Sequence, residues 1–232
     1  MRRPDLTLAL FPLLALAACG TTPTSAPMDH HGHGAHHRGH RFDDDPAQWA
    51  KRFDDPARDA WQKPDAVIAR LGLAADAQVA DVGAGTGYFA VRLARAVPHG
   101  AVWAADIEPT MVAWLADRAA REDVVNLRPL LAKPADPALP TPVDVIFICN
   151  TWHHVADRPA WLKAATAQLK PGGRIAILDY RVDFEGDGPP KDLQLTQKTV
   201  IAELQAAGFS LQDREDGEFP RQYLLVFGRP TP

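Results

Sequence analysis

The sequence has little cysteine, no excess of basic residues and no long apolar run. Its two cysteines, Cys19 and Cys149, exclude the multi-disulfide framework of a small secreted domain. A net charge of −4 provides no basic surface of the kind that binds nucleic acid. The apolar run Leu6–Ala18 is shorter than the about 20 residues that cross a bilayer. What is present, 46% hydrophobic and 23% charged residues among 232, is typical of one globular domain with additional segments.

The first 20 residues have the pattern of a secretion signal. Arg2 and Arg3 precede the apolar run, and small residues follow it. The end of the run, Leu16–Cys19, resembles a bacterial lipobox, in which the chain is cut before the cysteine and the thiol carries lipid. This resemblance implies a signal peptide over 1–18 and a lipid anchor at Cys19 on the periplasmic side of the cell envelope. The alternatives are a plain secretory signal and a cytosolic product that starts at Met28.

Residues 19–40 form a polar tether that contains six of the nine histidines: His30, His31, His33, His36, His37 and His40. Glycines between them disfavour a helix or a strand, so we expect disorder. Clustered imidazoles bind divalent ions such as Zn, Cu or Ni, and a solvated spacer is the alternative. Because the ligands have no fixed spacing, we predict no structural or catalytic metal site.

The remainder, 41–232, has the pattern of an α/β domain. Residues 41–75 predict short helices that cover something larger, including one that begins at Pro64 and ends near Gly72. Beyond them, apolar runs alternate with helical stretches, which predicts a doubly wound, mostly parallel sheet with helices on both faces. Cys149 ends the apolar run 143–149, so we expect a small buried residue there and no reactive thiol. Ligands of such sheets bind at the carboxyl ends of the strands.

A glycine loop follows the first of these strands, in the sequence VADVGAGTGYFA from Val79 to Ala90. Counted from Gly85, it satisfies the G-x-G-x-x-A form of a dinucleotide fingerprint, so the pattern alone leaves a dinucleotide open. Asp81 places a carboxylate at the strand end, where it would repel a diphosphate. The same charge would attract the sulfonium and ammonium of S-adenosylmethionine. The alternative is a structural carboxylate that bonds the amides of the loop.

A second carboxylate, Asp106, ends the next strand about 20 residues further on, where it can accept both hydroxyls of a ribose. That position serves NAD and S-adenosylmethionine equally. The alternative for Asp106 is a helix cap ahead of Pro109.

Four segments together resemble the motifs of class I S-adenosylmethionine-dependent methyltransferases: VADVGAGTGYFAVRLA, VWAADIEPTMV, LPTPVDVIFICNTWHHV and LKPGGRIAILDYR. Within that family they are most similar to the ubiquinone/menaquinone-methylase-like group, which acts on small molecules. The resemblance extends from Trp61 to Phe227. It implies a Rossmann-like seven-stranded sheet whose last strand is antiparallel, S-adenosylmethionine as cofactor, and methyl transfer to a small-molecule acceptor. The alternative function is an envelope lipoprotein that binds a nucleoside or metal on this fold without turnover.

The resemblance also assigns roles to individual positions. The methionine part of the cofactor would be lined by Asp81, Gly83, Ala84, Gly85 and Gly87, the ribose by Asp106, the adenine by Ile107 and Asp136, and the methyl group by Asn150 and Thr151. The family often has an acidic residue where Asn150 stands. His153 and His154 are the candidates for a base or acceptor ligand, with Tyr180 as a further candidate. The alternative is an imidazole that bonds the loop or caps the following helix.

Overall fold

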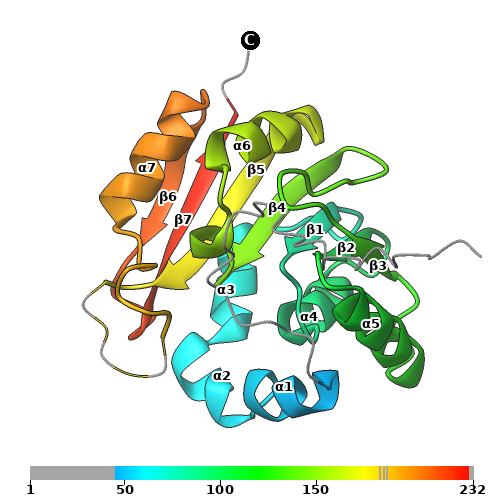
Figure 1. Ribbon diagram of the computed structural model, residues 1–232. Coiled ribbons are helices and arrows are strands. Elements are labelled where there is room, and N and C mark those ends of the chain that lie inside the picture. The colour runs from blue at the N-terminus through cyan, green and yellow to red at the C-terminus, as the bar shows by residue number, and fades with distance from the viewer. Residues whose placement is uncertain (1–44, 183, 185, 187, 230–232) are drawn as a thin grey trace, which may run out of the picture. The chain divides into compact units, whose positions relative to one another are not determined.

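The computed structural model describes residues 45–182, 184, 186 and 188–229. Its seven-stranded sheet has the order β3-β2-β1-β4-β5-β7-β6 (Figure 1). The strands are β1 Gln78–Val82, β2 Ala101–Asp106, β3 Leu127–Leu131, β4 Val143–Cys149, β5 Leu169–Tyr180, β6 Ser210–Glu215 and β7 Gln222–Gly228. Strands β1 to β5 pair in parallel, and β7 is antiparallel to both β5 and β6. This confirms the predicted doubly wound sheet with an antiparallel last strand.

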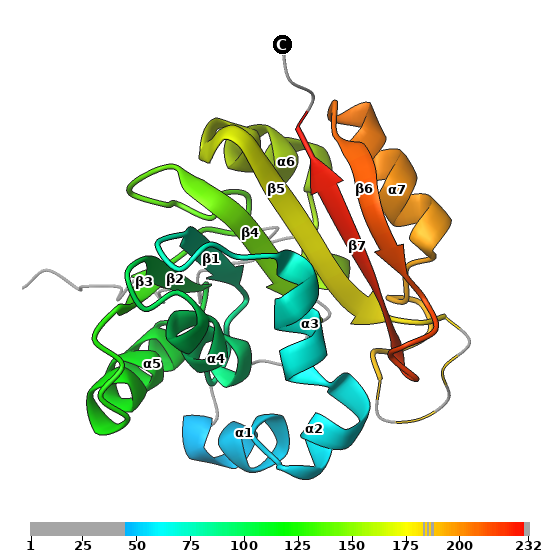
Figure 2. The same ribbon diagram turned by 180° about the vertical axis from the view of Figure 1, so that it is seen from behind.

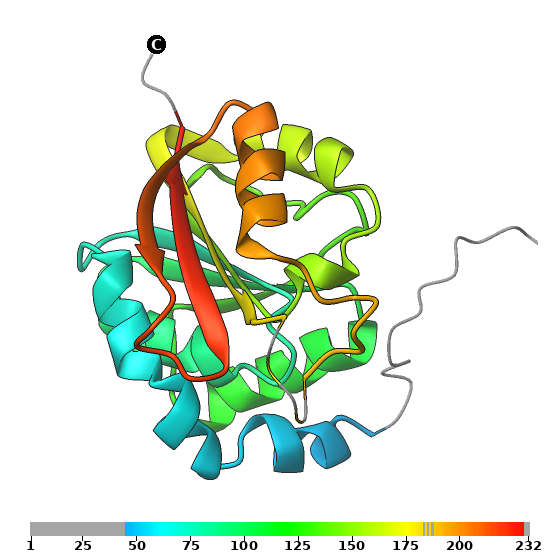
Figure 3. The ribbon, with the colours of Figure 1, turned by 90° about the vertical axis from the view of Figure 1, so that its left-hand side faces the viewer.

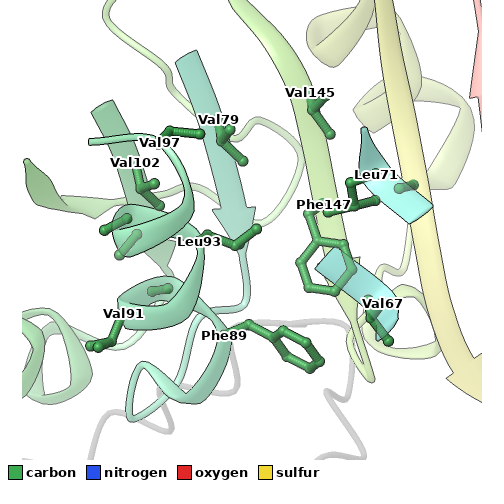
Figure 4. Close-up of a cluster of buried hydrophobic side chains, with 14 of the residues drawn as sticks. Val67, Leu71, Val79, Phe89, Val91, Leu93, Val97, Val102, Val145 and Phe147 are labelled. Atoms are coloured by element: carbon green, nitrogen blue, oxygen red, sulfur yellow. The ribbon is translucent and has the colours of Figure 1, made fainter. Parts of the chain in front are cut away.

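Helices cover both faces of the sheet, as Figures 2 and 3 show. On one face lie α3 Pro64–Leu71, α4 Tyr88–Ala96 and α5 Pro109–Arg121, and on the other lie α6 Arg158–Ala167 and α7 Gln197–Ala206. In the core of the first face, Phe89 of α4 packs edge-on against Phe147 of β4, with ring centroids 4.9 Å apart (Figure 4). Burial of each such side chain contributes about 1.5–3 kcal/mol. Helix α3 ends at Leu71 and Gly72 follows with φ +55°, as the sequence predicts.

Strand β5 is longer than the sequence indicates, since the apolar pattern predicts a strand only from Gly173. The structure begins it at Leu169, which pairs with Val143. A register shift between Val143 and Val145 absorbs the intervening Lys-Pro-Gly-Gly segment. Backbone pairing with β4 therefore extends the strand through a segment whose side chains alone indicate a turn.

Two short helices, α1 Pro46–Phe53 and α2 Ala57–Gln62, lie beyond the carboxyl ends of the parallel strands (Figures 1 and 2). They form the helical cover that the sequence predicts. Asp54 pairs with Arg118 of α5 at 2.9 Å, and Asp59 pairs with Arg92 of α4 at 3.0 Å. Asp59 also accepts a hydrogen bond from the Tyr88 hydroxyl. Because both partners flank the glycine loop, these contacts hold the cover over it.

The predicted signal peptide over 1–18 and the histidine-rich tether over 19–40 lie outside the described residues. Within 45–229, apart from the three undescribed positions, no helix is long and apolar enough to span a membrane. The same part of the chain contains no group of three His, Cys, Asp or Glu side chains that could hold a metal ion.

The strand order reverses between β1 and β4, which are neighbours in the sheet. Loops that follow parallel strands on the two sides of such a reversal diverge and leave room for a ligand. The loops after β1, β2, β4 and β5 carry nearly all of the candidate residues, so the topology brings them to one edge of the sheet.

Candidate functional site

The glycine loop after β1 has a backbone that only glycine adopts at low cost. Gly83, Gly85 and Gly87 have φ of +73°, +54° and +94°. A Cβ on Gly83 would lie 2.2 Å from the Thr151 hydroxyl oxygen. A Cβ on Gly85 would lie 3.8 Å from the ring of Phe53 in α1. The loop after β1 therefore touches the loop after β4 directly and lies beneath the helical cover.

Asp106 connects the ends of β1 and β2. Its Oδ2 accepts the Gly85 N–H at 2.8 Å, and its Oδ1 accepts the Glu108 N–H at 3.0 Å, just before α5 begins. Burial raises the pKa of this carboxyl. Each carboxylate oxygen has a further lone pair, so the group can brace the turn and still accept two hydroxyls. The N-cap of α5 is Glu108 and not Asp106, and the bond from Asp106 to the Glu108 amide is compatible with a ribose contact.

Two apolar side chains flank Asp106 at the sheet edge. Ile107 is 45% exposed, and Leu131, the register partner of Asp106 at the end of β3, is 51% exposed. Exposed large apolar side chains at a polar edge of the sheet are suited to pack against a flat ring of a ligand. Sequence reasoning missed Leu131, although an apolar residue at the last position of a strand beside Asp106 was the available signal.

Asp81 is 2% exposed within β1 and accepts a hydrogen bond from the backbone of Ala90 in the first turn of α4. Burial and the nearby Asp106 raise its pKa to about 7, while Arg58 of α2 acts in the opposite direction. Asp81 is therefore both a structural acceptor for α4 and a carboxylate whose ionised form needs a nearby cation.

Thr86 gives the glycine loop a buried hydroxyl that is free to bond a ligand. Its hydroxyl is buried without a hydrogen-bond partner among the described residues. Its carbonyl accepts a hydrogen bond from Arg118 at 2.8 Å, and the same nitrogen donates to Asp54 of the cover at 2.9 Å. Buried polar groups are rarely left unsatisfied, so this hydroxyl fits a site that a polar ligand completes. With Asp81 and Asp106, it makes the loop fit S-adenosylmethionine.

The raised pKa of Asp81 predicts a pH-dependent affinity for a cationic ligand. Below pH 7 the carboxyl is mostly protonated, and above it the charged form binds the cation. Affinity for S-adenosylmethionine should therefore rise about tenfold from pH 6 to pH 8, with release of a proton on binding. Calorimetry in two buffers of different ionisation enthalpy measures both quantities. Asp81→Asn should reduce the slope, and an equal slope in that variant would contradict the assignment.

The end of β4 carries a buried amide chain that the sequence did not indicate. Gln62 of α2 donates from its Nε2 to Gln222 of β7 at 2.8 Å and to the Cys149 sulfur at 3.3 Å, and Gln222 donates to Asn150. Asn150 has φ +54°, so the chain turns sharply there. Burial raises the pKa of Cys149 to about 12, which keeps it a thiol, although the residue is half-buried and not fully buried as the sequence predicts. The amides connect the cover to Asn150, which the resemblance places near the methyl group. The next residue, Thr151, packs on Gly83.

The two candidate histidines, after β4, have different surroundings. His153 is buried, and its Nδ1 lies 2.8 Å from Oδ1 of Asp179, at the end of β5. The side chains of His153 and Asp179 are each 3% exposed. The backbone N–H of Tyr180 also bonds Asp179, at 2.8 Å. His154 is exposed, with its ring centroid 4.2 Å from that of His153. The structure thus gives His153 a buried carboxylate partner that can orient it as a base.

Tyr180 belongs to a different part of the same edge. Its ring lies 6.2 Å from that of Trp61 in α2 and 5.9 Å from that of Phe184. Burial raises the pKa of its hydroxyl, which opposes a role as a proton acceptor near neutral pH.

Asp136 is held by contacts within the segment between β3 and β4 and with α6. Its Oδ1 accepts the Ala138 N–H at 2.7 Å and the Gln168 side-chain N–H at 2.6 Å, and these bonds lower its pKa. Gln168 is the C-cap of α6. The carboxylate therefore braces the loop before β4, and its contact with the adenine amino group stays a prediction.

Comparison with known proteins gives consistent relatives. Residues 79–173 match a family model described as a methyltransferase domain. The ubiquinone/menaquinone biosynthesis C-methyltransferase of Marinomonas sp. (strain MWYL1) is 32% identical over 117 residues, 49% of this chain and 46% of that protein. The 27-O-demethylrifamycin SV methyltransferase of Amycolatopsis mediterranei (strain S699) is 29% identical over 162 residues, 67% of this chain and 59% of that protein. The chain thus spans about half the length of these curated relatives.

Among solved structures, a SAM-dependent methyltransferase from Aquifex aeolicus is similar with a TM-score of 0.74 at 25% identity. The match covers 81% of this chain and 100% of that one. The glycopeptide N-methyltransferase MtfA, solved with S-adenosyl-L-methionine, has a TM-score of 0.59 at 16% identity, covering 72% of this chain and 87% of that one. At that identity the second likeness concerns the fold alone.

Proposed function

We propose that this protein transfers the methyl group of S-adenosylmethionine to a small-molecule acceptor. The match to a methyltransferase domain and the Rossmann-like fold support the proposal. The observation that carries the proposal is the position of Asp106. It bonds the amide of Gly85 while each oxygen retains a lone pair for a ribose hydroxyl. Asp81, buried near the carboxyl end of β1, adds a negative charge that favours a cationic ligand over a diphosphate.

When bound, S-adenosylmethionine supplies a methyl group on a positively charged sulfur. The chain then mainly has to orient two reactants, which contributes several kcal/mol to lowering the barrier. The rigid contact of Gly83 with Thr151 fixes the two loops that meet at the reversal of strand order. The cover, held by Asp54 and Arg118, excludes water from the glycine loop.

For a hydroxyl acceptor, His153 is the base. A neutral imidazole that donates its Nδ1–H to Asp179 leaves Nε2 as a proton acceptor. Asp179 selects this tautomer and stabilises the imidazolium formed when the acceptor proton arrives at Nε2. The proton of the acceptor hydroxyl would move to Nε2 of His153, and the methyl group that the bound cofactor supplies would take its place on the oxygen.

The test of cofactor choice is calorimetry of the full-length chain with S-adenosylhomocysteine and, separately, with NADH. We expect binding of the first and none of the second. Asp106→Asn should weaken binding about tenfold or more, because one oxygen that accepts a hydroxyl becomes an N–H donor. Asp144→Asn is the matched control, since Asp144 also bonds a backbone amide, that of Gln78, at the amino end of β1. Equal affinity in both variants would contradict the ribose assignment.

We also propose that the chain is exported and anchored by lipid at Cys19. The support is the charged head, short apolar run and lipobox-like end within residues 1–20. One lipid-bearing cysteine with two or more acyl chains gives stable anchoring. Mass spectrometry of the N-terminus in separated membrane and soluble fractions tests it. A lipidated Cys19 is expected, and a product that begins at Met28 would overturn the proposal.

A further inference from the structure

An aromatic cluster borders the site on the side of β5 and β7. It consists of Trp61 of α2, Tyr180 at the end of β5 and Phe184, with Arg221, just before β7, stacked on it. The Arg221 guanidinium carbon lies 4.6 Å from the ring centroid of Trp61 and 5.3 Å from that of Phe184. Both ends of the cluster join the site, because Tyr180 follows Asp179 and Arg221 precedes Gln222, which bonds Asn150.

The stacking of Arg221 uses only the face of its guanidinium. The N–H groups lie in the plane, along the edge, where they match a carboxylate or another flat anion. No carboxylate or carbonyl acceptor for these N–H groups occurs among the residues that the structure describes. The side chain is only half-buried, so its edge remains open to a ligand. Arg221 is thus held in place by rings while its strongest binding groups are unused.

The surroundings of the cluster are positively charged. Three arginines, Arg52, Arg58 and Arg221, act on the Tyr180 hydroxyl in the direction that lowers its pKa, against the larger effect of burial. Arg58 donates to the side chain of Gln62 and to the carbonyl of Phe53, which are both uncharged. Asp179, which precedes Tyr180 in β5, is paired with His153, and Arg58 also acts on Asp81. At the cluster itself, an anion would therefore meet the charge of Arg221, which has no carboxylate partner among the described residues.

We propose that the methyl acceptor is an anion with a flat, conjugated body, whose anionic group pairs with the edge of Arg221 and whose ring packs against Trp61 and Tyr180. This inference rests on the proposed function and specifies the substrate class of the same site. An acceptor with its anionic group on Arg221 would place the opposite end of its ring toward His153 and the end of β4. A hydroxyl at that end is the group from which His153 would take a proton.

The test uses three probes of one shape: 4-hydroxybenzoate, its uncharged methyl ester, and cationic tyramine. Their affinities for the full-length chain saturated with S-adenosylhomocysteine are measured by calorimetry. We expect the affinity for the benzoate to be at least about tenfold higher than that for the ester, and the affinity for tyramine to be the lowest of the three. Arg221→Gln should remove most of the preference for the benzoate, and Arg221→Lys should retain part of it, because the charge survives without the flat edge.

Arg128→Gln is the matched control, because Arg128 also stacks on a tryptophan, Trp103, at 5.3 Å, but on β3. It removes the same charge and the same kind of contact, and it should leave the preference unchanged. Equal binding of ester and benzoate, tighter binding of tyramine, or no binding of any probe would each overturn the inference. Failure of the proposed function is separate: S-adenosylhomocysteine itself would then not bind.

Discussion

Replacing His153 by alanine is expected to lower kcat for a hydroxyl acceptor about a hundredfold or more, while the affinity for S-adenosylhomocysteine stays within about twofold of the original. The imidazole is buried against Asp179 at 2.8 Å and lies on a loop separate from the glycine loop, which we expect to bind the cofactor. Its loss removes the proton acceptor and leaves cofactor binding intact. Single-turnover transfer of labelled methyl at saturating cofactor measures the change.

The adjoining histidine provides the control for this result. His154 is exposed, so His154→Ala should leave kcat nearly unchanged. Asp179→Asn should lower kcat in the same direction as the loss of His153 and alter the pH–rate profile, because an amide no longer fixes the tautomer or stabilises the imidazolium. If His154→Ala is the damaging change, the base is assigned to the wrong ring. If neither variant slows transfer, the reaction needs no base.

Replacing Gly83 by alanine is expected to abolish most cofactor binding, with a loss of affinity of about a hundredfold. The new Cβ would lie 2.2 Å from the Thr151 hydroxyl oxygen, far inside contact distance, so the loops after β1 and β4 must separate. The residue also has φ +73°, where a side chain costs about 1 kcal/mol. Calorimetry with S-adenosylhomocysteine and thermal unfolding of the same variant measure both effects.

Gly72 separates the two contributions. It has φ +55° but no atom within 4 Å of an added Cβ, so Gly72→Ala tests the backbone cost alone. It should lower stability by about 1 kcal/mol and leave cofactor affinity unchanged. If the two variants weaken cofactor binding equally, the close approach of the two loops is not what forms the site.

The fold by itself leaves the chemistry open. One architecture can support many unrelated reactions. Function therefore depends on the groups placed at the sheet edge. In this chain those groups are two buried carboxylates beside a glycine loop, a histidine oriented by an aspartate, and an arginine stacked on aromatic rings. Each of the three sets has a variant above that changes a different measured quantity.

The sequence alone was sufficient for the sheet and for the glycine loop. Apolar strands alternate with amphipathic helices, and that pattern has few compatible arrangements, so the parallel sheet followed from local periodicity. Gly83, Gly85 and Gly87 could be assigned because their requirement is local: a backbone conformation that other residues avoid. The place of Asp106 followed in the same way, from its position at the end of β2.

Partnerships between distant residues were decided only by the tertiary structure. Two adjacent histidines are equivalent in the sequence, and the turn after β4 buries His153 against Asp179, 26 residues away. The same holds for Gln62 and Gln222, 160 residues apart, and for Arg221, whose aromatic partners come from α2 and the segment after β5. The physical reason is that backbone preference and hydrophobic period act over a few residues. Which side chains share a buried site depends on strand order, and strand order is set by the packing of the whole sheet.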